Sequence, residues 1–344
     1  MKDLRGLATG IGSLPHKDAE AALDLVFKYL PSIPFWPQLP KRDIREGMVA
    51  QFSEGLPCIK LTDKGAIFNA DNREEELEKF YEKIISKDTE YFAISPDFAK
   101  GFYAFKQRLT KSNLNLIKEI KCHVVGPFTF AASFKDEDGK ALLHDSRMMQ
   151  AITEGLIMKA LWQIRLLEEF GKSMIVFIDE PYLGCFGSAY TPLNREDVVE
   201  VLAEFTKRIS SRGKVRTGIH CCGNTDWSIF TDIHTLDIIN FDAFSYLDKL
   251  LLYADDLKRF FDNDRVFCWG IVPTQEFDDK ITPEGLVKKI NEGIDILVKK
   301  GVDKDKLYEN LLLSPACGLG TLDIGKSEKI FELLSEVSSF ISHL

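Results

Sequence analysis

The sequence predicts an α/β fold, a single (β/α)8 TIM barrel that spans residues 1–344. Eight short apolar, β-rich runs alternate with amphipathic helical stretches, which is the element order of a parallel barrel. Polar and ligand-type residues recur where those strands end, and barrel active sites lie at that edge. No internal repeat or Gly/Ser/Pro-rich linker marks a domain boundary. An open doubly wound sheet is the alternative, but the chain lacks the Gly-x-Gly-x-x-Gly and P-loop fingerprints that would support it.

The first half of the chain contains three expected strands and three expected helices. An apolar run predicts the first strand over residues 7–13, and helical spacing of apolar residues predicts a helix over 18–30. A long connecting segment, which contains a charged helix, separates the second and third strands. The remaining elements of this half are strands at 33–37 and 121–125 and helices at 73–87 and 146–170, the last of them ended by Gly171.

The second half alternates more regularly. Its strands are continuous apolar runs of the kind that parallel sheets bury on both faces. Each is separated from the next by a stretch with helical periodicity. The expected strands cover 173–178, 215–219, 237–241, 265–271 and 311–314, and the expected helices cover 195–210, 226–233, 253–261, 283–300 and 327–341.

Composition excludes several classes of protein. With 45% apolar and 28% charged residues, the chain is typical of a soluble globular protein with a sizeable core. Its net charge of −9 argues against non-specific nucleic-acid binding. No apolar run is long enough to span a membrane, and the N-terminal residues lack the apolar segment of a signal peptide. Seven cysteines in such a chain favour free thiols or metal binding over a disulfide framework, so we expect a cytoplasmic protein.

A split histidine and cysteine set is the most informative feature. Side chains alternate faces along a strand, so His220 and Cys222 point to one side and Cys221 to the other. Cys317 follows a separate strand, in Ser-Pro-Ala-Cys-Gly-Leu. Three such ligands with one exchangeable position are the layout of a catalytic zinc site. The alternative is a buried histidine with two inert core thiols, and Asp242, after the next strand, is a ligand, a partner of His220 or an ordinary loop acid.

Two other motifs follow expected strands. Asp179 and Glu180 are adjacent acids after a buried strand, which predicts either a helix cap or a functional role, with Asp179 holding a substrate ammonium or orienting a donor. The segment Gly10–Pro15 is either an ordinary turn or a loop that brings backbone N–H groups against a carboxylate. Gln38 is expected at the rim of a rigid aromatic wall formed by residues 34–40.

Taken together, these motifs resemble the catalytic domain of cobalamin-independent methionine synthase, and more broadly the zinc methyltransferases built on the uroporphyrinogen decarboxylase-like barrel. The matching segments occur in the family's order and span most of the chain. They are Thr9-Gly-Ile-Gly-Ser13, Glu46-Gly-Met-Val-Ala-Gln-Phe52, Gly126-Pro-Phe-Thr129, Ile178-Asp-Glu-Pro181, His220-x-Cys222 and Pro315-Ala-Cys-Gly-Leu319.

The resemblance implies roles for these residues. Zinc would be held by His220, Cys222, Cys317 and Asp242, the last where the family has a glutamate. The Ile11-Gly12-Ser13 motif and Asp179 would contact the amino-acid part of homocysteine. Asp179 and Glu180 are the predicted catalytic residues, and Glu180 and His123 are candidates for the acid that a folate leaving group would need. The chain is too short for the additional N-terminal barrel of the full-length synthase, and residues 39–42 replace the family's His-Gly-Glu segment.

The expected function is therefore a zinc-dependent S-methyltransferase. It would move a methyl group from methyl-tetrahydrofolate or a methyl-corrinoid protein to a small-molecule thiol, homocysteine in the main interpretation, with no nucleic-acid or membrane partner. The alternatives are a methylcobamide:coenzyme M-type methyltransferase, a metal-free uroporphyrinogen decarboxylase-like lyase with an arginine-rich mouth, and a zinc-bound scaffold that docks a corrinoid protein.

Overall fold

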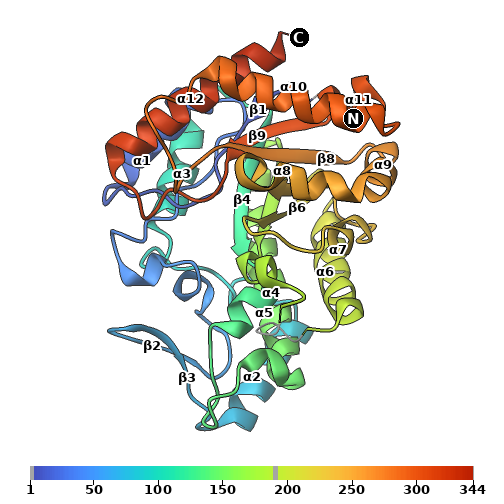
Figure 1. The fold of residues 1–344 in the computed structure, drawn as a ribbon. Helices are drawn as coiled ribbons and strands as arrows, with labels where there is room; N and C mark the ends of the chain where they lie inside the picture. Colours follow the sequence, from blue (N-terminus) through green and yellow to red (C-terminus); the bar gives the residue numbers. More distant parts are fainter. Residues whose placement is uncertain (1–3, 189–192, 344) are drawn as a thin grey trace.

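The protein is built around a curled sheet of seven parallel strands. A computed structural model describes residues 4–188 and 193–343. The strand order is β1-β9-β8-β7-β6-β5-β4, and the strand direction turns from β8 and β9 to β4 as the sheet curls (Figure 1). The strands are β1 (Leu7–Ala8), β4 (Glu119–Val125), β5 (Ser173–Asp179), β6 (Val215–Cys221), β7 (Ile238–Phe241), β8 (Val266–Val272) and β9 (Leu311–Pro315).

Twelve α-helices accompany the sheet within the described part of the chain. Helices α10 and α12 pack beside β8 and β9, and α5 packs beside β4 (Figure 1). The helices are α1 (Ala19–Tyr29), α2 (Arg73–Ile85), α3 (Lys100–Lys111), α4 (Pro127–Ala132), α5 (Ser146–Leu167), α6 (Arg195–Ser210), α7 (Ser228–Thr231), α8 (Ala243–Leu250), α9 (Ala254–Asp262), α10 (Pro283–Lys299), α11 (Lys304–Glu309) and α12 (Ile324–Ser342).

The predicted second strand, residues 33–37, does not form a strand. This segment makes single parallel bridges instead, one from Phe35 to Lys121 of β4 and one from Gln38 to Ser13. Pro34 and Pro37 have no backbone N–H to donate to a ladder, which explains why pairing stops at isolated bridges. The first strand is also shorter than the predicted 7–13. The expected eight-stranded barrel is thus formed only in part, as a curled seven-stranded sheet.

The inner face of the curled sheet carries a small core of its own. Ile175, Phe177, Ile238, Val266 and Leu312 are buried together there. The parallel register places Asp179 of β5 beside His220 of β6. The carboxyl ends of neighbouring strands therefore bring polar side chains to one edge of this inner core.

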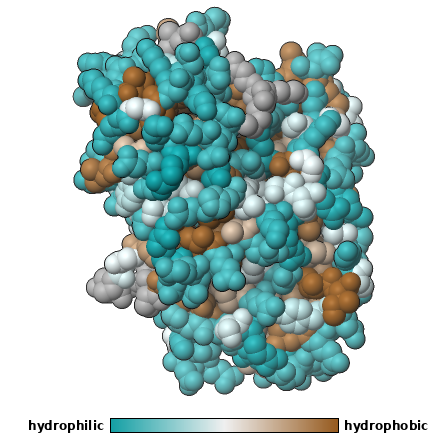
Figure 2. Space-filling view, turned by 90° about the vertical axis from the view of Figure 1, so that its right-hand side faces the viewer, coloured by the Kyte–Doolittle hydropathy of each residue, from teal (hydrophilic) through white to brown (hydrophobic). Residues whose placement is uncertain are grey.

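Part of the chain between β1 and β4 was not predicted. Strands β2 (Ile59–Thr62) and β3 (Gly65–Phe68) form an antiparallel hairpin that projects away from the main sheet (Figure 1). The surface view in Figure 2 is mainly hydrophilic, and its hydrophobic side chains form separate patches. None of the described helices combines the length and apolarity needed to cross a membrane.

A close backbone contact between α3 and the distant segment that contains Pro37 gives a stability prediction. A Cβ atom added at Gly101 would lie 1.8 Å from the carbonyl oxygen of Pro37. Gly101→Ala is therefore expected to lower the free energy of unfolding by roughly 2–3 kcal/mol, measured by urea denaturation. In Gly285→Ala, an exposed position near the start of α10, the nearest atom is at 3.4 Å, so no loss is expected. Equal stability of both variants would contradict the prediction.

Candidate metal centre and adjoining cavity

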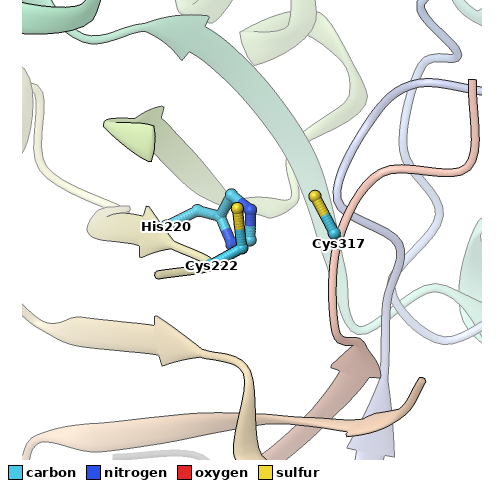
Figure 3. A group of neighbouring side chains, drawn as sticks. All are labelled: His220, Cys222 and Cys317. Carbon is cyan, nitrogen blue, oxygen red and sulfur yellow. The ribbon is translucent and has the colours of Figure 1, made fainter. Parts of the chain in front are cut away.

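Three predicted metal ligands come together at the carboxyl ends of β6 and β9. The ligand atoms of His220, Cys222 and Cys317 all lie within 4.8 Å of one another. Figure 3 shows His220 and Cys222 side by side, with Cys317 facing them from the opposite segment. Cys221 is fully buried and is not part of this group. The alternation predicted for the His-Cys-Cys strand end is confirmed.

The three groups also influence each other's protonation. A hydrogen bond from Cys222 lowers the pKa of Cys317 below its ordinary value, against the opposing effect of burial, and His220 adds to the lowering. The same contact raises the pKa of Cys222. Burial opposes the charged form of His220, but its contact with Cys317 leaves the pKa raised overall. The site thus already favours one thiolate, which is the protonation state that a metal requires.

The donor set fits zinc. Imidazole nitrogen and two thiolate sulfurs are ligands that zinc prefers, and catalytic zinc sites use three protein ligands with an open fourth position. The structure brings together ligands separated by almost a hundred residues in the chain, as Figure 3 shows. His220, Cys222 and Cys317 would therefore hold the ion.

A cavity of about 280 Å³ adjoins the three ligands. Of the predicted substrate-binding residues, Ile11, Ser13, Gln38 and Asp179 line it, and Gly12 does not. The other lining residues were given no role from the sequence, although several of them lie in the quoted motifs, because apolar and glycine residues carry no chemical signal of binding. They are Pro40, Met48, Pro181, Gln275, Gly318, Gly320 and Thr321.

Asp179 is the acidic group of the cavity lining. Its side chain is buried, and its Oδ1 atom has no hydrogen-bond partner among the described residues. Burial raises the pKa of Asp179 to about 6, although His220 and Lys121 act in the opposite direction. A buried carboxylate oxygen without a partner is costly unless a ligand satisfies it. Asp179 is therefore placed to receive a cationic or hydrogen-bond-donating group of a substrate.

The loop after β1 is tied to the loop that carries Cys317. Ser13 Oγ accepts a hydrogen bond from the Gly320 N–H at 3.2 Å, and the Ser13 carbonyl accepts one from the Leu319 N–H at 2.9 Å. Gly12 has a structural role. A Cβ atom at this position would lie 3.0 Å from the His123 ring, and the Gly12 carbonyl accepts a hydrogen bond from the Gln38 N–H. Gly12 was predicted to contact the substrate, but it does not line the cavity.

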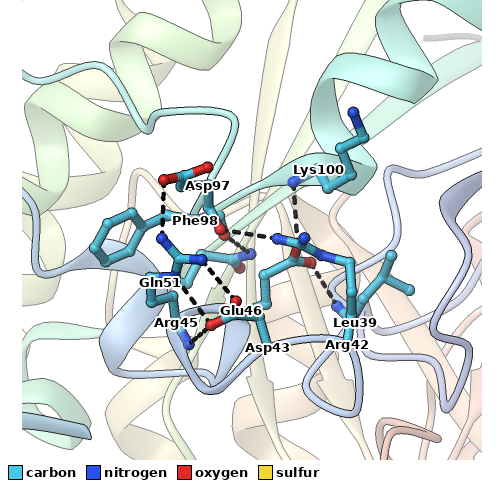
Figure 4. Close-up of polar contacts among 9 residues, drawn as sticks. All are labelled: Leu39, Arg42, Asp43, Arg45, Glu46, Gln51, Asp97, Phe98 and Lys100. Carbon is cyan, nitrogen blue, oxygen red and sulfur yellow. Dashed lines mark hydrogen bonds and ion pairs between the residues drawn. The ribbon is translucent and has the colours of Figure 1, made fainter. Parts of the chain in front are cut away.

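Gln38 is held by a polar network behind the cavity wall. Its Nε2 donates to Gln51 Oε1 at 2.7 Å, and Gln51 Nε2 donates to the Phe98 carbonyl at 2.7 Å. Buried Glu46 accepts hydrogen bonds from the Leu39 N–H at 3.1 Å and the Lys100 N–H at 3.2 Å (Figure 4). Arg42, Asp43, Arg45 and Asp97 complete the network in Figure 4. It anchors the segment that supplies Pro40 and Met48 to the cavity.

Glu180, predicted as catalytic, does not line the cavity. Its carboxylate receives the N–H groups of Phe128 at 2.9 Å and Thr129 at 2.8 Å and the Thr129 hydroxyl at 2.6 Å. These donors belong to the first turn of α4, so Glu180 acts as its N-terminal cap. Burial raises its pKa to about 7, opposed by those hydrogen bonds. Adjacent residues on a strand end point to opposite faces, which separates Glu180 from Asp179.

This placement predicts a structural effect for Glu180→Gln. The glutamine side chain would place its NH2 group against the N–H donors of α4, and two donors cannot form a hydrogen bond. We therefore expect the free energy of unfolding to fall by about 1–3 kcal/mol. Zinc content should not change. Glu200→Gln, at an exposed position in α6, is the control and should change stability by less than about 0.5 kcal/mol in the same denaturation experiment. Unaltered stability of Glu180→Gln with lost activity would instead support the predicted catalytic role.

Asp242 caps a helix. Its carboxylate accepts the Ser245 N–H at 2.8 Å at the start of α8. Within the described residues, the metal-ligand group contains His220, Cys222 and Cys317 without Asp242. Its role as a fourth ligand therefore stays a prediction.

Two buried polar residues of the inner face were missed by the sequence analysis. Lys121 Nζ donates to the Ile11 carbonyl at 2.5 Å and lies 4.4 Å from the ring centre of Phe177. Burial lowers its pKa to about 8. Asn240 contacts His220. The available signal was a polar side chain inside an apolar strand, at Lys121 in β4 and Asn240 in β7.

Comparison with known proteins gives a distant structural similarity. No family model matches the chain, and no curated protein matches it. The chain is similar to the solved structure of a B12-independent methionine synthase from Shewanella sp. W3-18-1 in complex with selenomethionine, with 18% sequence identity and a TM-score of 0.48. The match covers 70% of this chain and 67% of that chain. A similarity at this level does not establish a family.

Proposed function

We propose that this chain is a zinc-dependent methyltransferase that transfers a methyl group to the sulfur of a small thiol, with homocysteine as the acceptor. The observation that carries the proposal is the convergence of His220, Cys222 and Cys317 within 4.8 Å, beside a cavity. The unpartnered carboxylate oxygen of Asp179 lies in the lining of the same cavity.

Each residue has a defined part in this proposal. When bound, zinc supplies a Lewis acid that lowers the pKa of a substrate thiol, whose ordinary value is about 8.5, so that the thiolate form is available at neutral pH. Asp179 binds the ammonium group of the acceptor and orients its sulfur toward the three ligands. Ile11 and Ser13 shape the adjacent wall. Pro40, Met48 and Pro181 restrict water around the reacting sulfur.

The charge of the cavity favours this function over two alternatives. Among the described residues that line it, none is arginine or lysine. A tetrapyrrole with several carboxylates requires several cationic partners, so the lining disfavours a decarboxylase-like lyase. The one acid among these described lining residues, Asp179, favours an acceptor with an ammonium group, which homocysteine has and coenzyme M lacks. The methyl donor in this proposal is methyl-tetrahydrofolate or a methyl-corrinoid protein.

The test combines metal content with methyl transfer. Purified protein should contain about one zinc per chain and should form methionine from homocysteine with one of the two donors. Coenzyme M should not be methylated under the same conditions. Protein that takes up no added zinc would refute the proposed function. Protein that binds zinc and methylates no thiol with either donor would support the scaffold alternative.

A further inference from the structure

Asn240 contacts His220, the histidine of the candidate metal centre, at its Nδ1 atom. Its Oδ1 lies 2.5 Å from His220 Nδ1. Both side chains are buried, at 0% and 3% exposure. The contact therefore lies in a buried part of the protein.

The orientation of the Asn240 amide is determined by its other contacts. Its Nδ2 donates to the Cys268 carbonyl at 2.9 Å and to Ser314 Oγ at 2.8 Å. Ser314 in turn donates its hydroxyl hydrogen to the Pro315 carbonyl at 2.8 Å, so its oxygen accepts from Asn240. Backbone carbonyls, which can only accept, set the direction of this chain of hydrogen bonds.

The same hydrogen bonds determine which nitrogen of His220 carries the hydrogen. Because Nδ2 of Asn240 faces two acceptors, its Oδ1 must face His220. A carbonyl oxygen can only accept, so Nδ1 of His220 carries the hydrogen and Nε2 keeps its lone pair. A metal-binding histidine commonly has such a partner on its other nitrogen.

We propose that Asn240 is a positioning residue that fixes the tautomer and ring orientation of His220 and presents Nε2 to the metal. This inference rests on the proposed function for the presence of zinc, but the tautomer is a property of the metal-free protein. The hydrogen-bond chain ends at Pro315, two residues before Cys317. Asn240 therefore also connects β6, which carries one ligand, with the end of β9, which leads to another.

The experiment uses the full chain with Asn240→Leu, which removes the acceptor at similar size, and Asn240→Asp, which retains an acceptor. Zinc affinity is measured by competition with a chelator, and the His220 tautomer by 15N NMR of metal-free protein at a pH where the imidazole is neutral. We expect about 10–100-fold weaker zinc binding in Asn240→Leu and partial recovery in Asn240→Asp. The wild type should show the hydrogen on Nδ1.

Two results would overturn the inference. One is a folded Asn240→Leu variant that binds zinc as tightly as the wild type. The other is a wild-type NMR spectrum with the hydrogen on Nε2, which is decisive even if Asn240→Leu does not fold. Failure of the proposed function has a different signature, because wild-type protein would then take up no zinc while the NMR spectrum still reports the tautomer.

Discussion

Cys317→Ser should abolish stoichiometric zinc binding and leave the fold intact. The serine hydroxyl does not ionise near neutral pH, so the site would lose one of its two thiolates. Loss of a group that hydrogen-bonds a metal ligand weakens metal binding by about 10–100-fold. Loss of the ligand itself should therefore weaken zinc binding by more than about 100-fold. Cys317 is only partly buried and follows β9, so its replacement should leave the core unchanged. Zinc affinity is measured by chelator competition and methyl transfer by methionine formation.

Cys221→Ala is the matched control. Cys221 is adjacent to Cys222 in the chain, but it is fully buried and lies outside the ligand group. This variant should keep about one zinc per chain, with reduced stability from the lost packing. If folded Cys221→Ala lost zinc while Cys317→Ser retained it, the assignment of the ligands would be wrong.

Asp179→Asn should impair use of homocysteine while zinc binding is retained. The variant removes the negative charge that faces the substrate ammonium in our proposal, and truncating one side of a buried charged pair costs about 2–5 kcal/mol. We therefore expect kcat/KM for homocysteine to fall by at least about 30-fold. The control substrate is 4-mercaptobutanoate, which lacks the amino group and should be affected much less. Equal losses for both thiols would contradict the ammonium assignment.

The difference in stability between Asp179→Asn and the wild type should depend on pH. Burial raises the pKa of Asp179 from 3.8 to about 6, so the folded state holds its proton at higher pH than the unfolded state. Ionised Asp179 therefore destabilises the wild type as pH rises through this window. The free energy of unfolding of metal-free Asp179→Asn, relative to wild type, should increase between about pH 4 and pH 7. Urea denaturation across this range measures the difference, and a constant difference would contradict it.

The candidate metal centre was predictable from residue types at strand ends, and only its His220 and Cys222 half depends on local spacing. The alternation of side chains places His220 and Cys222 on one face, and the parallel register aligns strand ends. The carboxylates were harder to assign, because Asp179, Glu180 and Asp242 all follow apolar strands and have the same chemistry. Their environments differ: Asp179 faces the cavity, whereas Glu180 and Asp242 receive helix N–H groups.

The sequence by itself determined the α/β alternation and most strands of the sheet, and it singled out His220, Cys222 and Cys317 as candidate ligands. The strands depend on local periodicity and the candidate ligands on residue type, whereas the approach of Cys317 to the other two comes from the tertiary structure. Only the tertiary structure decided that residues 33–37 make isolated bridges, that Glu180 belongs to α4, and that Asn240 contacts His220. Each of these depends on contacts between segments distant in the chain, because a buried polar group takes the partner that packing places beside it.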